Sequence, residues 1–486
     1  MATTTIDRKK LLIDNEWRDA AGGRTMDVVN PATEEVIASV ASADRSDVDA
    51  AVAAARAAFN GPWGRMSARE RGRLVSRLAD RLMEKADEVS RLETLHNGKP
   101  IFESRQIEIP AAAECFEYYA GWADKVMGET IPVKGNFLTY TLREPLGVVA
   151  AIVPWNFPLL LAAWKIAPAL ATGNTVILKP ASQTPLTAIA LGEIAVEVGL
   201  PPGVLNVITG PGSSVGQAIV EHPGIDKIAF TGDTSTGKGI MRAAAATLKK
   251  ITLELGGKSP NIVLPDADVD AALRGATTGI FYGKGEVCAA ASRLLVAREI
   301  KDEFMTKLAA RTKKMVAGDP LDPKTRYGAL ASKKQLETVA RYVDVAKKEG
   351  ASLVAGGDRI DIGTGKGYFF APTVFDSVTP DMTIAREEIF GPVLATIEFT
   401  DLDEAIARAN GTQYGLAAAV WTRDVKKAHY VARRLQAGTV WINTYNVYDT
   451  AAPFGGYKAS GFGREMSAHA IEHYTQIKSV WVDLNL

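Results

Sequence analysis

The sequence has little sulfur, no excess charge of either sign and no long hydrophobic run. Only two of its 486 residues are cysteines, too few for a disulfide framework, and no Cys-x-x-Cys or Cys/His cluster indicates a metal site. Lysine plus arginine equals aspartate plus glutamate, at 56 each, so no net field draws the chain to nucleic acid or acidic lipid. No run reaches the roughly 18 apolar residues of a membrane helix, and the N-terminus lacks the apolar core of a signal peptide. These absences predict a cytoplasmic protein with a small-molecule or protein partner, with no role in binding nucleic acid or membrane.

What the sequence does contain is short apolar runs that alternate with helical patterns. A hydrophobic content of 47% over this length is ordinary for a globular protein of about two to four domains. The first series of predicted strands lies at residues 147–153, 174–179, 204–209 and 226–232. A helix is predicted from Pro185 to Gly199, between two of these strands. Strands that are apolar on both faces indicate a parallel sheet covered on both sides, as in a doubly wound nucleotide-binding domain.

A second α/β series follows residues 251–257. Its predicted strands lie at 292–297, 394–399, 416–421 and 438–443, and its predicted helices at 299–317, 332–350 and 424–436. Upstream helices are predicted at 44–59, where Asp44 and Asp47 supply the cap, and at 66–97 and 102–126. Segments 137–145 and 474–486 alternate like strands but lie outside both series. They indicate a β appendage that pairs with another subunit.

Two glycine-rich turns connect predicted strands to predicted helices. GPGSSVG occupies residues 210–216 and FTGDTSTG occupies residues 230–237. Backbone N–H groups at such a turn can bind a pyrophosphate, although a loose glycine cluster is equally typical of an ordinary tight turn. Two such turns in one parallel sheet favour a dinucleotide ligand.

Three reactive side chains lie in apolar or glycine-rich surroundings. Glu254 lies between two leucines, just before the Gly256-Gly257 pair, so it is either a solvent-facing residue or a general base of raised pKa. Asn156, in PWNFP, either caps a turn or donates to developing negative charge. Cys288, in GKGEVCAA, is either a buried structural cysteine or a nucleophile. The residues by themselves leave these alternatives open.

Nine stretches along the chain form an ordered set of motifs. They are REPLGVV (143–149), PWNFPLL (154–160), GNTVILKPA (173–181), FTGDTSTG (230–237), LELGGKSPN (253–261), GEVCAAASR (285–293), EEIFGPV (387–393), NGTQYGLAAAVWT (410–422) and PFGGYKASGFGRE (453–465). Together they resemble the NAD(P)-dependent aldehyde dehydrogenase superfamily from end to end. The resemblance is nearest to its non-phosphorylating group, which oxidises aliphatic and aromatic aldehydes.

The resemblance implies a fold class and an assembly. It implies an α/β protein with a doubly wound, Rossmann-like cofactor domain, a second α/β catalytic domain and a small β oligomerisation appendage. The ranges expected are 1–126 and 147–256 for the cofactor domain, 257–460 for the catalytic domain, and 127–146 with 461–486 for the oligomerisation segments. A homodimer or a homotetramer is expected.

The resemblance also assigns chemical roles. Cys288 matches the nucleophile, Glu254 the general base, and Asn156 the amide that stabilises the oxyanion together with the Cys288 backbone N–H. The thiolate adds to the aldehyde to give a thiohemiacetal, hydride leaves for the nicotinamide, and Glu254 assists hydrolysis of the remaining thioester. The residues expected to bind NAD or NADP are Trp155, Lys179, Ser182, Gly212, Phe230, Gly232, Asp233, Leu255, Gly256, Glu388 and Phe390. No metal is expected, and Cys115 is interpreted as structural.

Four residues depart from the family's pattern. Gly283 stands where Asn is common, and Glu286 where Gln is common. The Glu286 carboxylate would either raise the pKa of the nearby thiol or face solvent. Asp233 replaces a usual Ser in the pyrophosphate turn. Ser182 occupies a position where many NAD-preferring members have Glu, so we expect NADP to be accepted and used at least comparably to NAD.

The substrate is expected in a tunnel of aromatic and apolar side chains. By resemblance its lining is Phe157, Leu161, Trp164, Tyr282 and Tyr448, with Tyr445, Asn446 and Val447 beside Tyr448 at the mouth. No Arg or Lys stands among them, which favours a medium-chain or aromatic aldehyde. A betaine-type amino-aldehyde is the alternative, because Tyr and Trp faces attract cations. A cofactor-independent cysteine acyl-transfer enzyme and a non-catalytic scaffold are two further classes that the sequence disfavours.

Overall fold

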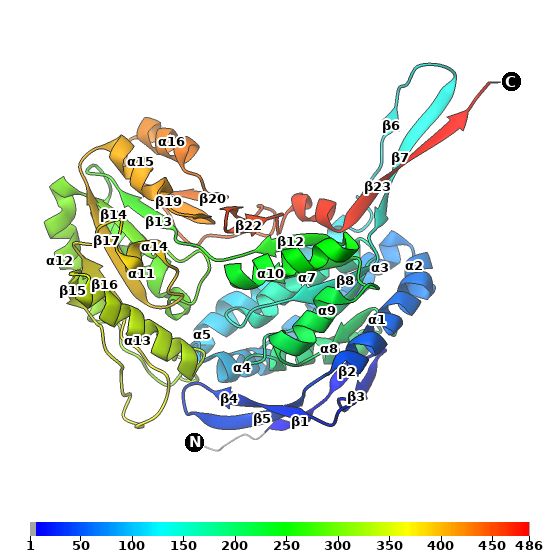
Figure 1. Ribbon diagram of the computed structural model, residues 1–486, viewed down its shortest axis with the longest axis horizontal. Helices are drawn as coiled ribbons and strands as arrows, with labels where there is room; N and C mark the ends of the chain where they lie inside the picture. The colour runs from blue at the N-terminus through cyan, green and yellow to red at the C-terminus, as the bar shows by residue number, and fades with distance from the viewer. Residues whose placement is uncertain (1–5, 486) are drawn as a thin grey trace.

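The computed structural model describes residues 6–485, and it arranges them as two α/β units and a small projecting sheet (Figure 1). The first unit holds an eight-stranded sheet of order β22-β12-β11-β8-β9-β10-β2-β3. Its strands are β2 (Leu11–Ile13), β3 (Glu16–Arg18), β8 (Val148–Ile152), β9 (Thr175–Lys179), β10 (Leu205–Val207), β11 (Lys227–Thr231), β12 (Lys250–Glu254) and β22 (Gly461–Phe462). The five strands from β12 to β10 are parallel, as predicted. Antiparallel strands that the sequence analysis missed complete both edges.

Successive residues of the central strands face opposite sides of this sheet. Val148, Ala150 and Ile152 share a buried cluster with α1 (Arg45–Asn60), α9 (Gln217–Glu221) and α10 (Thr234–Ala244). Val149 and Ala151 share another with α3 (Ala68–Glu84), α6 (Ile109–Trp122), α7 (Pro158–Ala171) and α8 (Leu186–Glu197). Helices therefore cover both faces, which confirms the doubly wound prediction and explains why these strands are apolar throughout.

The N-terminal helices differ in detail from the predicted ranges. Asp44 caps α1 in a capping box with Asp47, as expected. The predicted helical region 66–97 is divided at Lys85 into α3 and α4 (Ala86–Asn97). The region 102–126 begins with α5 (Ile101–Glu103) and a π-helical turn at Ser104–Glu108 before α6. Pro110 is the second residue of α6, and because it has no N–H it cannot continue the regular hydrogen-bond ladder from the preceding turn. Within residues 6–485, no helix is long and apolar enough to cross a bilayer.

The second unit holds a seven-stranded sheet of order β15-β16-β17-β14-β13-β19-β20. Its strands are β13 (Pro260–Val263), β14 (Arg293–Ala297), β15 (Ser352–Ala355), β16 (Thr373–Asp376), β17 (Val393–Phe399), β19 (Ala417–Trp421) and β20 (Thr439–Ile442). All pairs are parallel except β15 with β16. The helices are α11 (Val269–Phe281), α12 (Lys301–Thr312), α13 (Lys333–Lys348), α14 (Thr383–Arg386), α15 (Leu402–Asn410) and α16 (Val425–Arg434). The second α/β series is thus confirmed, with β13, β15 and β16 added.

The projecting sheet joins two segments that are far apart in sequence. β7 (Phe137–Pro145) pairs antiparallel with β23 (Thr475–Asp483) along its whole length, and β6 (Thr130–Ile131) adds a short third strand. Figure 1 shows this sheet extending away from the first unit. The segment predicted from residue 461 begins too early, because β22 at 461–462 hydrogen-bonds to β12 in the eight-stranded sheet. A separate three-stranded sheet, β1 (Ile6–Lys9), β5 (Glu35–Ala41) and β4 (Thr25–Asn30), lies near the N-terminus.

Candidate active site

The predicted site residues gather where the parallel strands of the first sheet end, and that is where ligands bind in open α/β sheets. Trp155 and Asn156 follow β8, Lys179 and Ser182 follow β9, Gly212 follows β10, Phe230, Gly232 and Asp233 follow or end β11, and Glu254, Leu255 and Gly256 end or follow β12. Cys288, Glu388 and Phe390 reach the same place from loops of the second unit. Cys288 and Glu254 line one cavity together with Leu161, Trp164, Leu255 and Phe454.

The Cys288 thiol lies on the wall of this cavity and is partly exposed, unlike the fully buried Cys115 in α6. Burial first, then the Glu388 and Glu254 carboxylates, raise the pKa of Cys288 to about 12. The thiol is therefore protonated at neutral pH in this state, and a nucleophilic role requires a group that takes its proton. Cys115 sits in the core, as its structural interpretation predicted.

Glu254 is a buried carboxyl group whose oxygens make no hydrogen bond within residues 6–485. Its side chain is 3% exposed. Burial first and the Glu465 carboxylate second raise the pKa of Glu254 well above its ordinary value. Gly455 gives this side chain room, because a Cβ there would lie 2.8 Å from Glu254 Oε1. A buried, unpartnered carboxyl of raised pKa in a cavity has the properties of a general base.

Behind Glu254 stands an ion pair that the sequence analysis missed. Lys165 of α7 pairs with Glu465, and its Nζ also donates to Thr231 Oγ1 at 2.6 Å. The Lys165 side chain is fully buried, and the two partners are 300 residues apart. Glu465 ends the last of the nine motifs, whereas Lys165 lies outside all of them, so no local pattern connects the two residues.

Asn156 is held on both sides. Its Nδ2 donates to the backbone carbonyl of Glu286 at 2.9 Å, and its own carbonyl accepts from Lys99 Nζ at 2.7 Å. That contact uses one of the two amide hydrogens, and within residues 6–485 Nδ2 makes no second hydrogen bond. Asn156 follows β8 as expected, although it is not among the residues that line the cavity, and Lys99 with its partner Glu108 was missed.

Glu286 does not behave as the sequence analysis expected. Its side chain is 1% exposed, so the solvent-facing alternative is wrong. Its carboxylate lies 3.0 Å from Lys284 Nζ and accepts from the Ala331 N–H at 2.9 Å. The carboxylates that raise the pKa of the thiol are Glu388 and Glu254. Instead, the Glu286 carboxylate forms an ion pair with the buried Lys284.

The loops on the cofactor side bring together residues from both units. Glu388 accepts from the Gly257 N–H at 3.0 Å, and a Cβ at Gly256 would lie 1.9 Å from Glu388 Oε2. The paired glycines thus permit the close approach that the sequence predicted. Burial raises the pKa of Glu388 to about 7. The rings of Trp155 and Phe390 meet edge to face, with centroids 5.2 Å apart.

The two glycine turns differ from each other. GPGSSVG forms a π-helical turn at Gly212–Gly216 before the short α9. FTGDTSTG leads directly into α10, whose N-cap is Asp233. Its Oδ1 accepts from the N–H groups of Ser235 and Thr236 at 2.9 and 3.0 Å. The departure at Asp233 therefore has a local role, because its carboxylate occupies amides that would otherwise face an anion.

Lys179 and Ser182 lie between these turns. Lys179 Nζ donates to the Pro180 carbonyl at 3.0 Å, and burial lowers its pKa to about 8. Ser182 Oγ donates to the Gly210 carbonyl at 3.1 Å, which joins the loop after β9 to the first glycine turn.

Of the predicted tunnel residues, Leu161 and Trp164 line the cavity, whereas Phe157, Tyr282 and Tyr448 are not among its lining residues. Phe157 stacks on Tyr282 at a centroid distance of 6.2 Å, and Phe454 contacts both Trp164 and Tyr448 at 5.6 and 5.7 Å. Phe454 was missed, although it is the second residue of a recognised motif. Tyr445 lies deeper than the predicted mouth, because it is buried and its hydroxyl donates to the Ala289 carbonyl at 2.8 Å.

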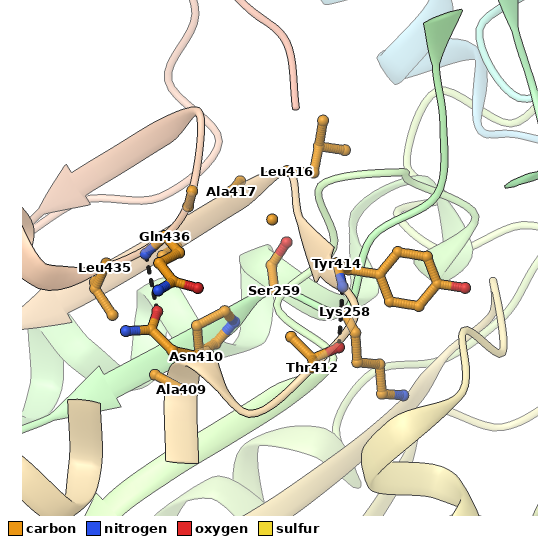
Figure 2. Close-up of a pocket in the computed structure, with 14 residues that line it drawn as sticks. Lys258, Ser259, Ala409, Asn410, Thr412, Tyr414, Leu416, Ala417, Leu435 and Gln436 are labelled. Atoms are coloured by element: carbon orange, nitrogen blue, oxygen red, sulfur yellow. Dashed lines mark hydrogen bonds between the residues drawn. The ribbon is translucent and has the colours of Figure 1, made fainter. Parts of the chain in front are cut away.

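A second pocket lies between the end of the LELGGKSPN segment and the segments near residues 409–418 and 435–437 (Figure 2). Lys258, Ser259, Asn410, Thr412 and Gln436 are among its lining residues, and none of the predicted site residues is. Figure 2 shows the Lys258 amine pointing away from Asn410 and Gln436. This pocket is separate from the cavity of Cys288, although Leu416 borders both.

The chain is similar to known proteins in both sequence and structure. The sequence profile described as "Aldehyde dehydrogenase family" matches residues 17–480. The mitochondrial aldehyde dehydrogenase of Homo sapiens is 49% identical over 476 residues, covering 97% of this chain and 92% of its own. The NAD⁺ complex of an aldehyde dehydrogenase from Bacillus cereus superposes with a TM-score of 0.97 at 49% identity, covering 100% of this chain and 98% of that one. An indole-3-acetaldehyde dehydrogenase in complex with NAD⁺ superposes with a TM-score of 0.96 at 46% identity, covering 98% and 97%.

Proposed function

This chain belongs to the aldehyde dehydrogenase family, and we propose that it oxidises an aldehyde to a carboxylic acid through a covalent bond to Cys288. It is an NAD(P)-dependent aldehyde dehydrogenase by this membership. The observation that carries the proposal is the cavity in which the Cys288 thiol meets a buried, unpartnered Glu254.

Glu254 serves as the proton acceptor. Its two free oxygens can take the thiol proton, and the resulting thiolate adds to the aldehyde carbon to give a thiohemiacetal. The negative charge that develops on the former carbonyl oxygen is met by the Asn156 amide and the Cys288 backbone N–H. Loss of hydride from this adduct leaves a thioester on Sγ. Once Glu254 has released that proton to solvent, it removes a proton from the water that attacks the thioester, which frees the carboxylic acid and returns the proton to the Cys288 thiol. The Lys165–Glu465 ion pair lies close enough to Glu254 to influence its charge.

The chain's cofactor residues fit a nicotinamide dinucleotide. The buried Lys179 ammonium makes a hydrogen bond to a single backbone carbonyl, so it has donors to spare for a ribose or a phosphate. Glu388 lies against Gly256 and Gly257 at the rim shared by both units, where it would hold the nicotinamide ribose. When bound, the oxidised nicotinamide accepts the hydride. NAD⁺ is present in the two related structures described above, and NADP is proposed as an additional cofactor because Ser182 is neutral.

The substrate is proposed to be a medium-chain or aromatic aldehyde. Among the described residues that line the cavity, Leu161, Trp164, Leu416 and Phe454 supply an apolar surface, and none is a lysine or an arginine. Such a lining favours apolar chains and rings over a substrate with a second carboxylate. The aromatic cluster of Trp164, Phe454 and Tyr448 also suits a quaternary ammonium, so a betaine-type amino-aldehyde is the second candidate.

One panel of aldehydes tests these proposals. Hexanal, phenylacetaldehyde, betaine aldehyde and glutaric semialdehyde are each supplied with NAD or NADP, and the absorbance of the reduced nicotinamide is followed. We expect the first two to have the highest kcat/KM. A higher kcat/KM for betaine aldehyde selects the second candidate, and no reduction with any aldehyde contradicts the proposed function.

The projecting sheet is proposed to serve assembly into a homodimer or homotetramer. Phe137, Leu142, Ile477 and Trp481 on β7 and β23 are exposed apolar residues, which a partner subunit would cover. Ending the chain after Glu472 removes β23, and we expect inactive or aggregating protein by size-exclusion chromatography and assay. A fully active monomer contradicts this role. The cytoplasmic location stays a prediction.

A further inference from the structure

Lys284 is a buried cation that the proposed chemistry does not use. It lies four residues before Cys288, and its side chain is 2% exposed. Its Nζ lies 3.0 Å from Glu286 Oε2, and it donates to Asn97 Oδ1 at 2.6 Å and to the Asn97 carbonyl at 3.3 Å. A buried ammonium is costly unless it is paired and hydrogen-bonded, and here it is both.

The contacts of Lys284 close a ring around the catalytic amide. Asn97, the last residue of α4, donates from Nδ2 to the Trp155 carbonyl at 2.7 Å. Glu286 accepts from Asn156 Nδ2 at its backbone carbonyl, at 2.9 Å. These contacts link Trp155 to Asn97, Asn97 to Lys284, Lys284 to Glu286, and Glu286 to Asn156. Because Asn156 follows Trp155 in the chain, the contacts form a closed ring. Lys284 is the only member of the ring that contacts both Asn97 and Glu286 through its side chain.

The backbone at Lys284 is bent to make these contacts. Its φ is +60°, in the left-handed region that residues with a Cβ seldom adopt, and Gly283 before it has a φ of +55°. Glu286 is fixed from its other side as well, because its Oε1 accepts from the Ala331 N–H. An unfavourable backbone conformation that persists in an active-site loop must be held by its surroundings, and the buried ion pair supplies that restraint.

We propose that Lys284 is a positioning residue for the oxyanion-stabilising amide of Asn156. It fixes the Glu286 segment, whose carbonyl takes one hydrogen of the amide. The second hydrogen is then oriented toward the oxyanion that forms at Cys288. This inference rests on the proposed function, because it requires that Asn156 donate to the oxyanion.

A double-mutant cycle tests the proposal. We expect Lys284→Met to lower kcat by about 10- to 100-fold, below the 10²- to 10³-fold typical of losing an oxyanion donor, with the dissociation constant of NAD changed less than twofold. In an Asn156→Ala background, the same substitution should lower kcat by less than about threefold, because Lys284 then has no amide to orient. Additive losses overturn the proposal, since a residue that merely stabilises the fold would act independently of Asn156. The matched control is Lys249→Met, which removes a buried ammonium that donates to the Val220 and His222 carbonyls.

A second variant separates stability from activity. Lys284→Met leaves the Glu286 carboxylate buried without its cation, so the melting temperature should fall. Adding Glu286→Gln removes that charge, and the melting temperature should recover while kcat remains low. Recovery of both quantities overturns the positioning role, and this doubly substituted protein replaces Lys284→Met if the single variant does not fold. If Asn156→Ala itself retains wild-type kcat, the proposed function fails at Asn156, which is a result distinct from additivity.

Discussion

Glu254 and Glu286 are two buried carboxyl groups of one active site, and their surroundings have opposite character. Both are at most 3% exposed, and burial is the largest cause raising the pKa of each. Glu254 has no hydrogen-bond partner among the described residues and faces a second carboxylate, Glu465. Glu286 is bound to a lysine and to a backbone N–H. The difference separates a carboxyl that is available for proton transfer from one that is committed to holding a loop.

The contrast could not be obtained from the sequence. Glu254 lies in an apolar strand and Glu286 in a polar, glycine-rich loop, so solvent exposure was the simpler expectation for Glu286. Its Oε1 accepts from the distant Ala331 N–H, and its neighbour Lys284 is held by the still more distant Asn97. Burial of a loop residue depends on such distant contacts, which local composition does not report.

Removing the thiol should have the largest effect. Cys288→Ala deletes the group that Glu254 is proposed to deprotonate, so aldehyde oxidation should fall by about 10⁴-fold or more. Cofactor binding should be unchanged, as measured by isothermal titration calorimetry with NAD. Normal turnover in this variant would contradict the proposal that Cys288 is the nucleophile and that Glu254 takes its proton.

Matched isosteric substitutions test the comparison directly. Glu254→Gln should lower kcat by about 10²- to 10⁴-fold, the range for a general base, whereas Glu286→Gln should lower it by less than about tenfold. Because Glu254 is proposed to take the thiol proton and then to act in hydrolysis, its variant should slow both steps, and the stopped-flow rate of the first turnover of reduced cofactor should fall together with kcat. Equal losses in the two variants, or a Glu254→Gln protein that only unfolds, would mean that both carboxyls are structural.

The pH dependence should distinguish the two carboxyls further. A general base must be ionised, so kcat should fall about tenfold per pH unit below the raised pKa of Glu254. This acid limb should be absent in Glu254→Gln and retained in Glu286→Gln. The raised pKa also means that the folded protein binds the proton more tightly than the unfolded chain. Stability is therefore lost as pH rises from 4.5, the ordinary value, to the raised value, and Glu254→Gln should gain in relative melting temperature over that window. An unchanged acid limb in Glu254→Gln assigns the titration to another group.

The sequence predicted those parts of the molecule that local patterns determine. The central parallel strands are apolar on both faces, and Cys288, Glu254 and Asn156 each lie inside a short motif, so both could be predicted. The edge strands β2, β3 and β22 have three residues or fewer, which is too short for a period to be visible. Lys165, Glu465 and Lys99 act through partners that only the folded chain brings together, and so does Lys284 in its hydrogen bond to Asn97. These contacts are electrostatic and join residues that are distant in sequence. A motif therefore identifies the residues proposed to touch substrate but not the charged partners that hold them.

The smallest effect is expected at the proposed cofactor site, at Ser182 and Lys179. These two residues show a contrast like that between Glu286 and Glu254, because one is already hydrogen-bonded and the other is free to bind a ligand. Ser182 Oγ is bound to the Gly210 carbonyl, whereas the buried Lys179 ammonium has donors to spare. A neutral Ser182 does not repel a 2′-phosphate, and Lys179 can partly neutralise it. The segment 179–184 contains no Arg to clamp the phosphate, and Asp233 adds negative charge at the next turn, so the advantage of NADP should be modest.

Substituting Ser182 with glutamate should therefore lower the ratio of kcat/KM for NADP to kcat/KM for NAD by about tenfold. This change corresponds to about 1.4 kcal/mol, near the lower end of the range for hydrogen bonds to charged groups. Ser182→Gln is the matched control, because it adds the same length without the charge and should leave NADP use largely intact. In the wild type, the NADP to NAD ratio should decline as pH rises through about 8, where Lys179 loses its proton and with it the attraction for the phosphate. A wild-type protein that does not use NADP at any of these pH values shows that another part of the adenosine site excludes the phosphate, and that Ser182 does not decide cofactor choice.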